Sequence, residues 1–256
     1  MQMTAIMTDR QAEITKRWSN GDGYDAYIQD ELASFRKSAW KKQILSHFPA
    51  GQTLNILDVG TGPGLFPCIL SEEGHRVTGI DCSEGMLQHA RENARRLGVS
   101  PQFLIMDTHE LDFPVESFDL VVSRNVSWTL HTPELAYAEW RRVLRPGGRV
   151  LIYDANWHLQ FYNEEIDRQV KRNEQAYYDK FGKHFYVCSY DADYKQYYDS
   201  LPLSNVCRPE WDVHTLERLG FETVQTRLDI GQDVYENWEK ELYSASPLFE
   251  IEAVKA

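Results

Sequence analysis

The sequence of 256 residues lacks the features that mark several protein classes. No apolar run approaches the roughly 20 residues that a membrane-spanning helix requires. The N-terminal segment MQMTAIMTDRQAEITKRW has no basic stretch followed by a continuous apolar one, so it does not predict a secretory signal. Internal repeats and low-complexity tracts are also missing. We therefore expect a soluble, cytoplasmic protein with no membrane partner.

Cysteine is scarce, and no two cysteines form a CxxC pair. Such usage does not match the dense framework of a small disulfide-stabilised domain, so we expect reduced thiols and no metal site. The alternative is a metal site from His184, Cys188, Cys207 and His214, although its spacings fit no established ligand knuckle. The four cysteines are Cys68, Cys82, Cys188 and Cys207.

The sequence also has fewer basic than acidic residues. Lys and Arg number 27 against 39 Asp and Glu, which gives a net charge of −12 at pH 7. The basic residues are scattered or stand beside acids rather than forming a stripe. Because a negative field repels a phosphate backbone, we expect a small-molecule substrate rather than a nucleic acid, bound by a monomer or a homodimer.

From Thr53 onward, short apolar runs alternate with helical stretches, which is the pattern of βαβ units and a parallel sheet around one core. The predicted strands span residues 54–59, 76–81, 102–107, 118–123 and 149–154, followed later by 221–230 and 247–254. The predicted helices span 64–73, 85–97, 133–144 and 211–219, and Pro146-Gly147-Gly148 ends the third of these.

The most specific motif is ILDVGTGPG at 56–64, an apolar strand that runs into three alternating glycines before a helix. A chain that turns sharply against a ligand needs residues without a Cβ atom. Dinucleotide-binding turns follow GxGxxG, whereas these glycines follow GxGxG, with Asp58 two residues before the first. A carboxylate there repels a pyrophosphate but attracts the α-amino group of a methionyl moiety. The spacing therefore favours S-adenosylmethionine over a nicotinamide dinucleotide.

Acidic or polar residues end the next three predicted strands. Asp81 ends the second strand, where an acid accepts hydrogen bonds from both ribose hydroxyls of either cofactor. Asp107 ends the third, where a carboxylate can meet an adenine amino group; the alternative is that it caps the following turn. The fourth strand ends at Asn125, beside the expected position of the reacting group.

Four segments resemble the class I S-adenosylmethionine-dependent methyltransferase superfamily, in particular the type 11 branch that includes the ubiquinone and menaquinone C-methyltransferases. They are DVGTGPG (58–64), VTGIDCSEGML (77–87), MDTHELDFPVESFDLVVSRNVSWTL (106–130) and EWRRVLRPGGRVLIYDANW (139–157). The resemblance covers residues 50–157, with weaker agreement further on. It implies an α/β fold with a Rossmann-like mixed seven-stranded sheet, mostly parallel with an antiparallel C-terminal strand. It also implies S-adenosylmethionine as cofactor and S-adenosylhomocysteine as product.

The resemblance also implies which residues form the site. Those expected at the cofactor are Tyr27, Asp58, Gly60, Thr61, Gly62, Asp81, Cys82, Met86, Asp107, Thr108 and Asn125. Those expected in the substrate pocket are Trp128, Asn156, Trp157 and Tyr162. The catalytic base is unassigned, with His131 and His158 as candidates. The alternatives are a core position for Met86 and a solvated side chain for either histidine.

Two segments depart from the βαβ alternation. Residues 10–48 carry a helical pattern broken near 19–23, and residues 155–210 are polar and rich in tyrosine. We divide the chain into an N-terminal helical cap (1–50), a cofactor-binding core (51–155), a helical substrate-covering insertion (156–210) and the C-terminal part of the core sheet (211–256). The aromatic residues of the insertion can stack a planar acceptor or hold a cationic one; the alternative is that they only form a small core.

We therefore predict an enzyme that transfers a methyl group by in-line displacement to an O, N or S atom of a small molecule. A base is needed only if the acceptor must lose a proton. The sequence has no NPPY-type or catalytic-cysteine signature, which disfavours methylation of amide nitrogen or base carbon. Two alternatives stay open: a non-catalytic protein that senses the cofactor or supports a partner, and an NAD-dependent oxidoreductase, which the glycine spacing disfavours.

Overall fold

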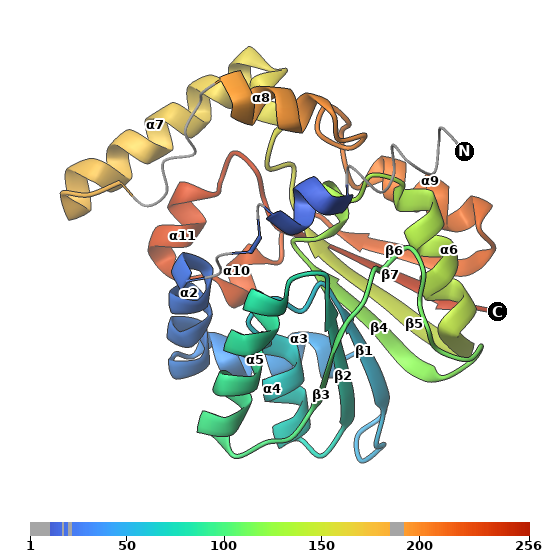
Figure 1. Cartoon of the computed structure of the whole chain (residues 1–256). Coiled ribbons are helices and arrows are strands. Elements are labelled where there is room, and N and C mark those ends of the chain that lie inside the picture. The colour runs from blue at the N-terminus through green and yellow to red at the C-terminus, as the bar shows by residue number, and fades with distance from the viewer. Residues whose placement is uncertain (1–10, 17, 20–21, 185–191) are drawn as a thin grey trace.

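The computed structural model describes residues 11–16, 18–19, 22–184 and 192–256, and within them one seven-stranded sheet forms the centre (Figure 1). The strand order is β3-β2-β1-β4-β5-β7-β6. Strands β1 to β5 pair in parallel, and β7 is antiparallel to both β5 and β6. The predicted fold is confirmed. The strands are β1 (Asn55–Val59), β2 (Arg76–Asp81), β3 (Gln102–Ile105), β4 (Phe118–Arg124), β5 (Leu144–Asp154), β6 (Phe221–Arg227) and β7 (Phe249–Lys255).

The described helices cover both faces of the sheet and its upper edge. None of them is long and apolar enough to cross a lipid bilayer. They are α2 (Asp22–Ala33), α3 (Arg36–Leu45), α4 (Leu65–Glu72), α5 (Glu84–Leu97), α6 (Pro133–Val143), α7 (Glu164–Phe181), α8 (Ala192–Asp199), α9 (Glu210–Arg218), α10 (Gly231–Val234) and α11 (Asn237–Leu242).

The apolar strands fill two separate cores because successive side chains of a strand point to opposite faces. In β1, Ile56 packs with α3 and α4, whereas Leu57 packs with α6 and α9. In β4, Val122 and Val121 divide in the same way. A strand that is buried on both faces carries a continuous apolar run, which explains why these strands could be predicted from the sequence.

Some predicted boundaries differ from the structure. Strand β3 ends at Ile105 because the chain turns at Asp107, whose Oδ1 accepts the backbone N–H of His109 at 2.9 Å. Helix α2 begins at Asp22, inside the segment predicted to break the helical pattern. Strand β5 begins at Leu144 rather than Arg149, because Leu144 already pairs with Phe118 of β4.

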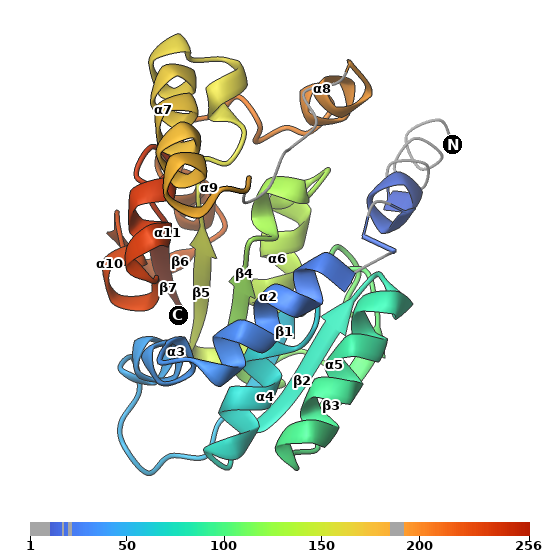
Figure 2. The same cartoon turned by 90° about the vertical axis from the view of Figure 1, so that its left-hand side faces the viewer.

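All five parallel strands end at one edge of the sheet, and the segment after β5 lies over that edge. Figures 1 and 2 show α7 and α8 above the end of β5. Ile14, in the helical turn 11–16, packs in one cluster with Tyr197 and Tyr198 of α8. The strand order changes direction between β1 and β4, and open α/β sheets bind ligands at such a point.

Candidate functional site

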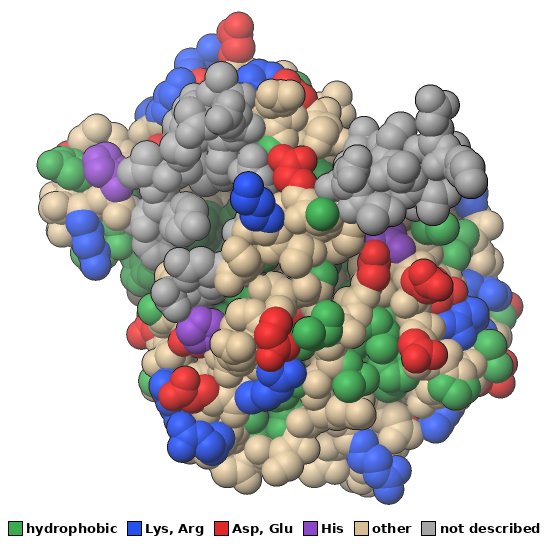
Figure 3. All heavy atoms as spheres, in the orientation of Figure 1, with side chains coloured by type: hydrophobic (Ala, Val, Ile, Leu, Met, Phe, Trp, Pro, Cys, Tyr) green, Lys and Arg blue, Asp and Glu red, His purple; other side chains and the backbone are tan. Residues whose placement is uncertain are grey.

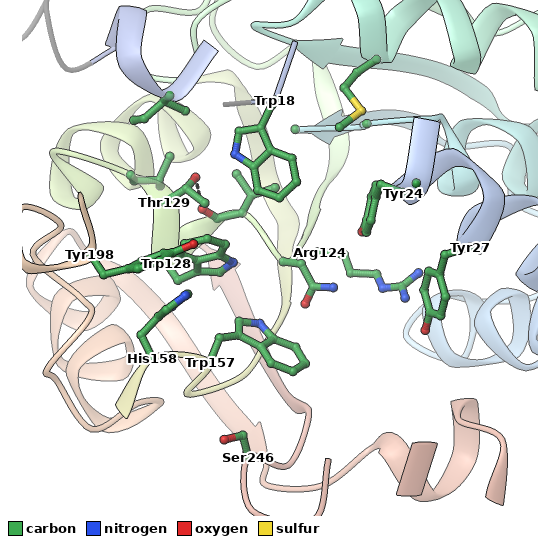
Figure 4. Close-up of a pocket in the computed structure, with 18 of the residues that line it drawn as sticks. Trp18, Tyr24, Tyr27, Arg124, Trp128, Thr129, Trp157, His158, Tyr198 and Ser246 are labelled. Carbon is green, nitrogen blue, oxygen red and sulfur yellow. Dashed lines mark hydrogen bonds between the residues drawn. The ribbon is translucent and has the colours of Figure 1, made fainter. Parts of the chain in front are cut away.

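A cavity of about 1040 Å³ opens at the ends of β1, β2, β4 and β5. Pockets that enclose one drug-sized ligand measure roughly 300–1,000 Å³, so this cavity has room for two molecules side by side. Its two halves differ in chemistry. The glycine loop and the carboxylates Asp81 and Asp107 line one half, and aromatic side chains line the other. Figure 4 shows the aromatic half, with Trp128, Trp157, His158 and Tyr198 on one side, opposite Tyr24, Tyr27 and Arg124.

The glycine loop after β1 forms the floor of the first half. Gly60 and Gly62 line the cavity with φ of 66° and 52°, values that favour glycine. A Cβ atom on Gly60 would lie 2.4 Å from Cγ2 of Val126, so the loop also needs glycine for space. The Gly62 N–H donates to Oδ2 of Asp81 at 2.9 Å, which fixes the loop against the end of β2.

Asp58 lies behind this loop rather than in the large cavity. It borders a small adjoining pocket with Gly60, Thr61 and Arg124, and its Oδ2 accepts the Thr61 hydroxyl at 2.6 Å. Burial raises the pKa of Asp58 to about 7, with the charge of Asp81 adding to the rise and the Thr61 hydroxyl opposing it. The carboxyl group therefore titrates near neutral pH.

The ends of β2 and β3 supply the remaining polar wall. Asp81 lines the cavity together with Cys82 and Met86, and its Oδ1 accepts the backbone N–H of Ser83 at 2.9 Å. Asp107 and Thr108 also line it. Burial raises the pKa of Asp107, but hydrogen bonds from the side chain and backbone of His109 outweigh it, and the net pKa is lowered. The Asp107 carboxylate therefore stays charged.

Asn125 directly follows β4 and lines the cavity. It is one of two described non-glycine residues with positive φ, at 57°. Its Oδ1 is buried without a hydrogen-bond partner among the described residues. A strained backbone together with an unsatisfied buried oxygen is typical of a ligand-binding position.

A buried ion pair closes the wall beside Asn125. Arg124 donates from both terminal nitrogens to Glu31 of α2, at 2.8 and 3.0 Å. Burial disfavours the charged guanidinium, but the charge of Glu31 holds the pKa of Arg124 well above its ordinary value. The neighbouring Tyr27 lines the cavity and donates its hydroxyl to Glu239 at 2.6 Å. The guanidinium is therefore neutralised by the protein itself.

Aromatic rings form the second half. Trp128, Trp157, His158 and Tyr198 surround it in Figure 4. The His158 imidazole stacks on the Tyr198 ring with centroids 3.6 Å apart and lies 4.5 Å from Trp128. Burial lowers the pKa of His158 to about 3, so the imidazole is neutral at physiological pH.

The Asp154 carboxylate at the end of β5 holds these walls in place. Its Oδ1 accepts the indole N–H of Trp157 at 3.0 Å, and its Oδ2 accepts the backbone N–H of Trp128 at 3.2 Å. The second oxygen also accepts a terminal N–H of Arg208 at 2.8 Å, and Arg208 in turn forms two bonds of 2.8 Å with Asp212. Asp154 and Asp212 are fully buried, and Arg208 is buried as well.

Comparison with known proteins identifies one domain of the chain. Residues 57–152 match the family model described as a methyltransferase domain. The chain contains a class I S-adenosylmethionine-dependent methyltransferase domain. The cofactor of that class is S-adenosylmethionine, and the glycine cradle and the unsatisfied Asn125 oxygen fit a bound ligand at this position.

Two curated relatives match part of the chain. Malonyl-(acyl-carrier protein) O-methyltransferase of Erwinia pyrifoliae is 42% identical over 111 residues, 43% of this chain and 40% of the relative. Phosphatidylethanolamine N-methyltransferase of Cereibacter sphaeroides is 44% identical over 101 residues, 38% of this chain and 48% of the relative. The matched part thus spans less than half of either relative.

A solved structure matches over most of the chain. Phosphoethanolamine N-methyltransferase 2 of Haemonchus contortus, in complex with S-adenosyl-L-methionine, gives a TM-score of 0.59 at 20% identity. The match covers 90% of this chain and 57% of that one, and it shows the common fold.

Three predicted site residues border neither the cavity nor the small pocket beside it, which corrects those predictions. The Asn156 side chain exchanges two hydrogen bonds with the backbone of Arg208, so it connects the walls instead of lining them. Tyr162 is 39% exposed and donates its hydroxyl to Asp199 on the outer surface. His131 stacks on His109 with centroids 3.9 Å apart, behind the wall.

Asp107, His109 and His131 bring three potential metal ligands within 4.8 Å of one another. The two imidazole planes are within 15° of parallel, so their nitrogen lone pairs point along separate planes and do not converge on one ion. Of the alternative ligand set, Cys188 lies outside the described residues, and the His214 side chain is 86% exposed. The three described cysteines are free thiols.

We predict that Gly60→Ala lowers S-adenosylhomocysteine affinity at least tenfold, because the new methyl group collides with Val126. It should also lower the free energy of unfolding by about 1–2 kcal/mol from the left-handed backbone. Gly98→Ala is the matched control, since Gly98 has φ of 70° and a Cβ atom there would meet no other atom within 4 Å. Calorimetric titration and urea unfolding measure both effects, and equal affinities in the two variants would contradict the role of the loop.

Asp154→Asn should lower the free energy of unfolding by about 1–3 kcal/mol, because its amide group presents a donor to neighbouring donors. It should also shift tryptophan emission, since Trp128 and Trp157 lose their common anchor. Asp212→Asn is the control: it weakens the Arg208 pair without a bond to either tryptophan. An unchanged emission spectrum in Asp154→Asn would contradict the anchoring role.

Proposed function

We propose that this protein transfers a methyl group from S-adenosylmethionine to a small-molecule acceptor. The observation that carries the proposal is a single cavity with a polar, glycine-floored half and an aromatic half, with Asn125 in its lining. A polar half with Asp81 and Asp107 suits a nucleoside with an amino-acid arm. The aromatic half then remains open for an acceptor instead of being filled by side chains, which favours catalysis over a sensor that only binds the cofactor.

When bound, S-adenosylmethionine supplies an electrophilic methyl group on a positively charged sulfur. The residues of this chain align the acceptor with that group and exclude water, which are the main contributions an enzyme makes to such a displacement. We assign the amino-acid arm to Gly60 and Gly62, the ribose to Asp81, and the adenine to Asp107 with Thr108. Tyr27, Thr61, Cys82 and Met86 complete the cofactor half as supporting contacts.

His158 faces the acceptor as a neutral hydrogen-bonding group. With its pKa at about 3, the imidazole does not retain an abstracted proton at neutral pH. We therefore assign it a positioning role, and Trp128 and Trp157 the walls of the acceptor half.

Several observations favour a small molecule over a polymer. The net charge is −12, and acidic and basic side chains lie interspersed over the face shown in Figure 3. The helical turn 11–16 and helices α7 and α8 all contribute residues to the cavity lining. A cytoplasmic location and a monomeric or homodimeric state remain predictions.

The test is to incubate the pure protein with methyl-labelled S-adenosylmethionine and a fractionated cell extract. We expect label in a low-mass fraction, from which mass spectrometry identifies the acceptor. Label in protein or RNA would overturn the small-molecule assignment. Tight S-adenosylhomocysteine binding without transferred label would favour the sensor.

Cofactor affinity should depend on pH through Asp58. The pKa of this group is about 7 without ligand. Gly60 lines both the cavity and the small pocket at Asp58, so a ligand ammonium held at Gly60 stabilises the charged carboxylate, and binding lowers the pKa and releases a proton. S-adenosylhomocysteine should therefore bind about tenfold more weakly at pH 6 than at pH 8. Asp58→Asn should bind weakly with a flat profile. A wild-type affinity that is flat over the same range would place the ammonium elsewhere.

A further inference from the structure

The acceptor half of the cavity has an unusual charge balance. The rings of Trp128, Trp157 and Tyr198 line it, and one face of the Tyr198 ring is covered by His158. The buried Arg124 is neutralised by Glu31, and His158 is uncharged, so neither offers a free positive charge. Lys183, the one lysine among the described residues that line the cavity, is exposed at its rim.

One carboxylate of the cavity lining accepts no hydrogen bond and forms no ion pair in the described part of the chain. Glu174 of α7 lines the cavity three residues before Tyr177, and no hydrogen bond or ion pair of its carboxylate occurs among the described residues. The neighbouring Lys171 is engaged with Asp167 at 2.7 Å. Burial raises the pKa of Glu174, with the charge of His184 opposing the rise. A half-buried acid without such a partner is available to a cationic ligand.

We propose that the acceptor is an organic amine, recognised in its cationic form by the faces of Trp128, Trp157 and Tyr198 and by the Glu174 carboxylate. Aromatic faces attract a desolvated cation through their quadrupoles, and a carboxylate adds a charge of opposite sign. A neutral hydroxylated or thiol acceptor can donate a hydrogen bond to the carboxylate, but it lacks the charge that both features attract. The proposal rests on the proposed function, because it assigns the acceptor of that same reaction.

The chemistry is consistent with such an acceptor. An ammonium ion must lose its proton before attack, and Glu174 is a carboxylate of the cavity lining to which we assign that proton. The freed lone pair forms the N–C bond to the methyl group as the C–S bond breaks, and sulfur keeps the electron pair. The methylated product is again cationic and fits the same aromatic walls.

The test compares two probes of equal shape that differ in charge. (3-Hydroxyphenyl)trimethylammonium and 3-tert-butylphenol differ only by a charged nitrogen in place of a carbon. In calorimetric titrations of the protein saturated with S-adenosylhomocysteine, the cation should bind about tenfold more tightly. Glu174→Gln should remove most of that preference and leave the affinity for 3-tert-butylphenol unchanged.

Glu164→Gln is the matched control, because Glu164 lies on the same helix with a 95% exposed side chain. It should leave both affinities as in the wild type. Equal or tighter binding of the neutral probe by the wild type would overturn the amine assignment while the methyltransferase proposal stands. Failure of S-adenosylhomocysteine to bind at all would instead overturn the proposed function.

Discussion

The buried carboxylate of Asp154 connects the chain segments from which the acceptor half of the site is built. It ends β5, and its hydrogen bonds reach Trp128 after β4, Trp157 after β5 and Arg208 before α9. Such a buried acid is stabilised only while its charge is balanced and its lone pairs are used, as they are here. The positions of the two indoles therefore depend on an interaction that lies behind them.

The cofactor half was predictable because its signals are local. The alternating glycines at 60–64 and the acids Asp81 and Asp107 stand directly at strand ends, and parallel strands bring those ends together without further information. The acceptor half depends on distant pairs: Arg124 and Glu31 are 93 residues apart, and Arg208 and Asp154 are 54 apart. The spacing of apolar residues along the sequence does not indicate which charged residues pair over such distances.

The same limit explains the pocket residues that were misassigned. Asn156 and Trp157 follow the end of β5, and this position predicted that both lie close to the cavity. It did not predict which of the two side chains points into the cavity. In the structure Trp157 lines the cavity, whereas Asn156 donates a hydrogen bond to the Arg208 backbone. The direction of each side chain is set by its hydrogen bonds to Asp154 or Arg208, which are formed in the tertiary structure. The position of a residue in the sequence determines only which part of the fold it lies near.

In the proposed function, the cofactor fills the polar half of the cavity and leaves the aromatic half to the acceptor. A crystal structure of the protein with S-adenosylhomocysteine tests it most directly. We expect the ribose hydroxyls to bind Asp81 and the amino-acid arm to lie over Gly60 and Gly62. The thioether sulfur should lie near Asn125 and face the indoles of Trp128 and Trp157. A ligand whose adenine or amino-acid arm occupies the aromatic half would contradict this arrangement.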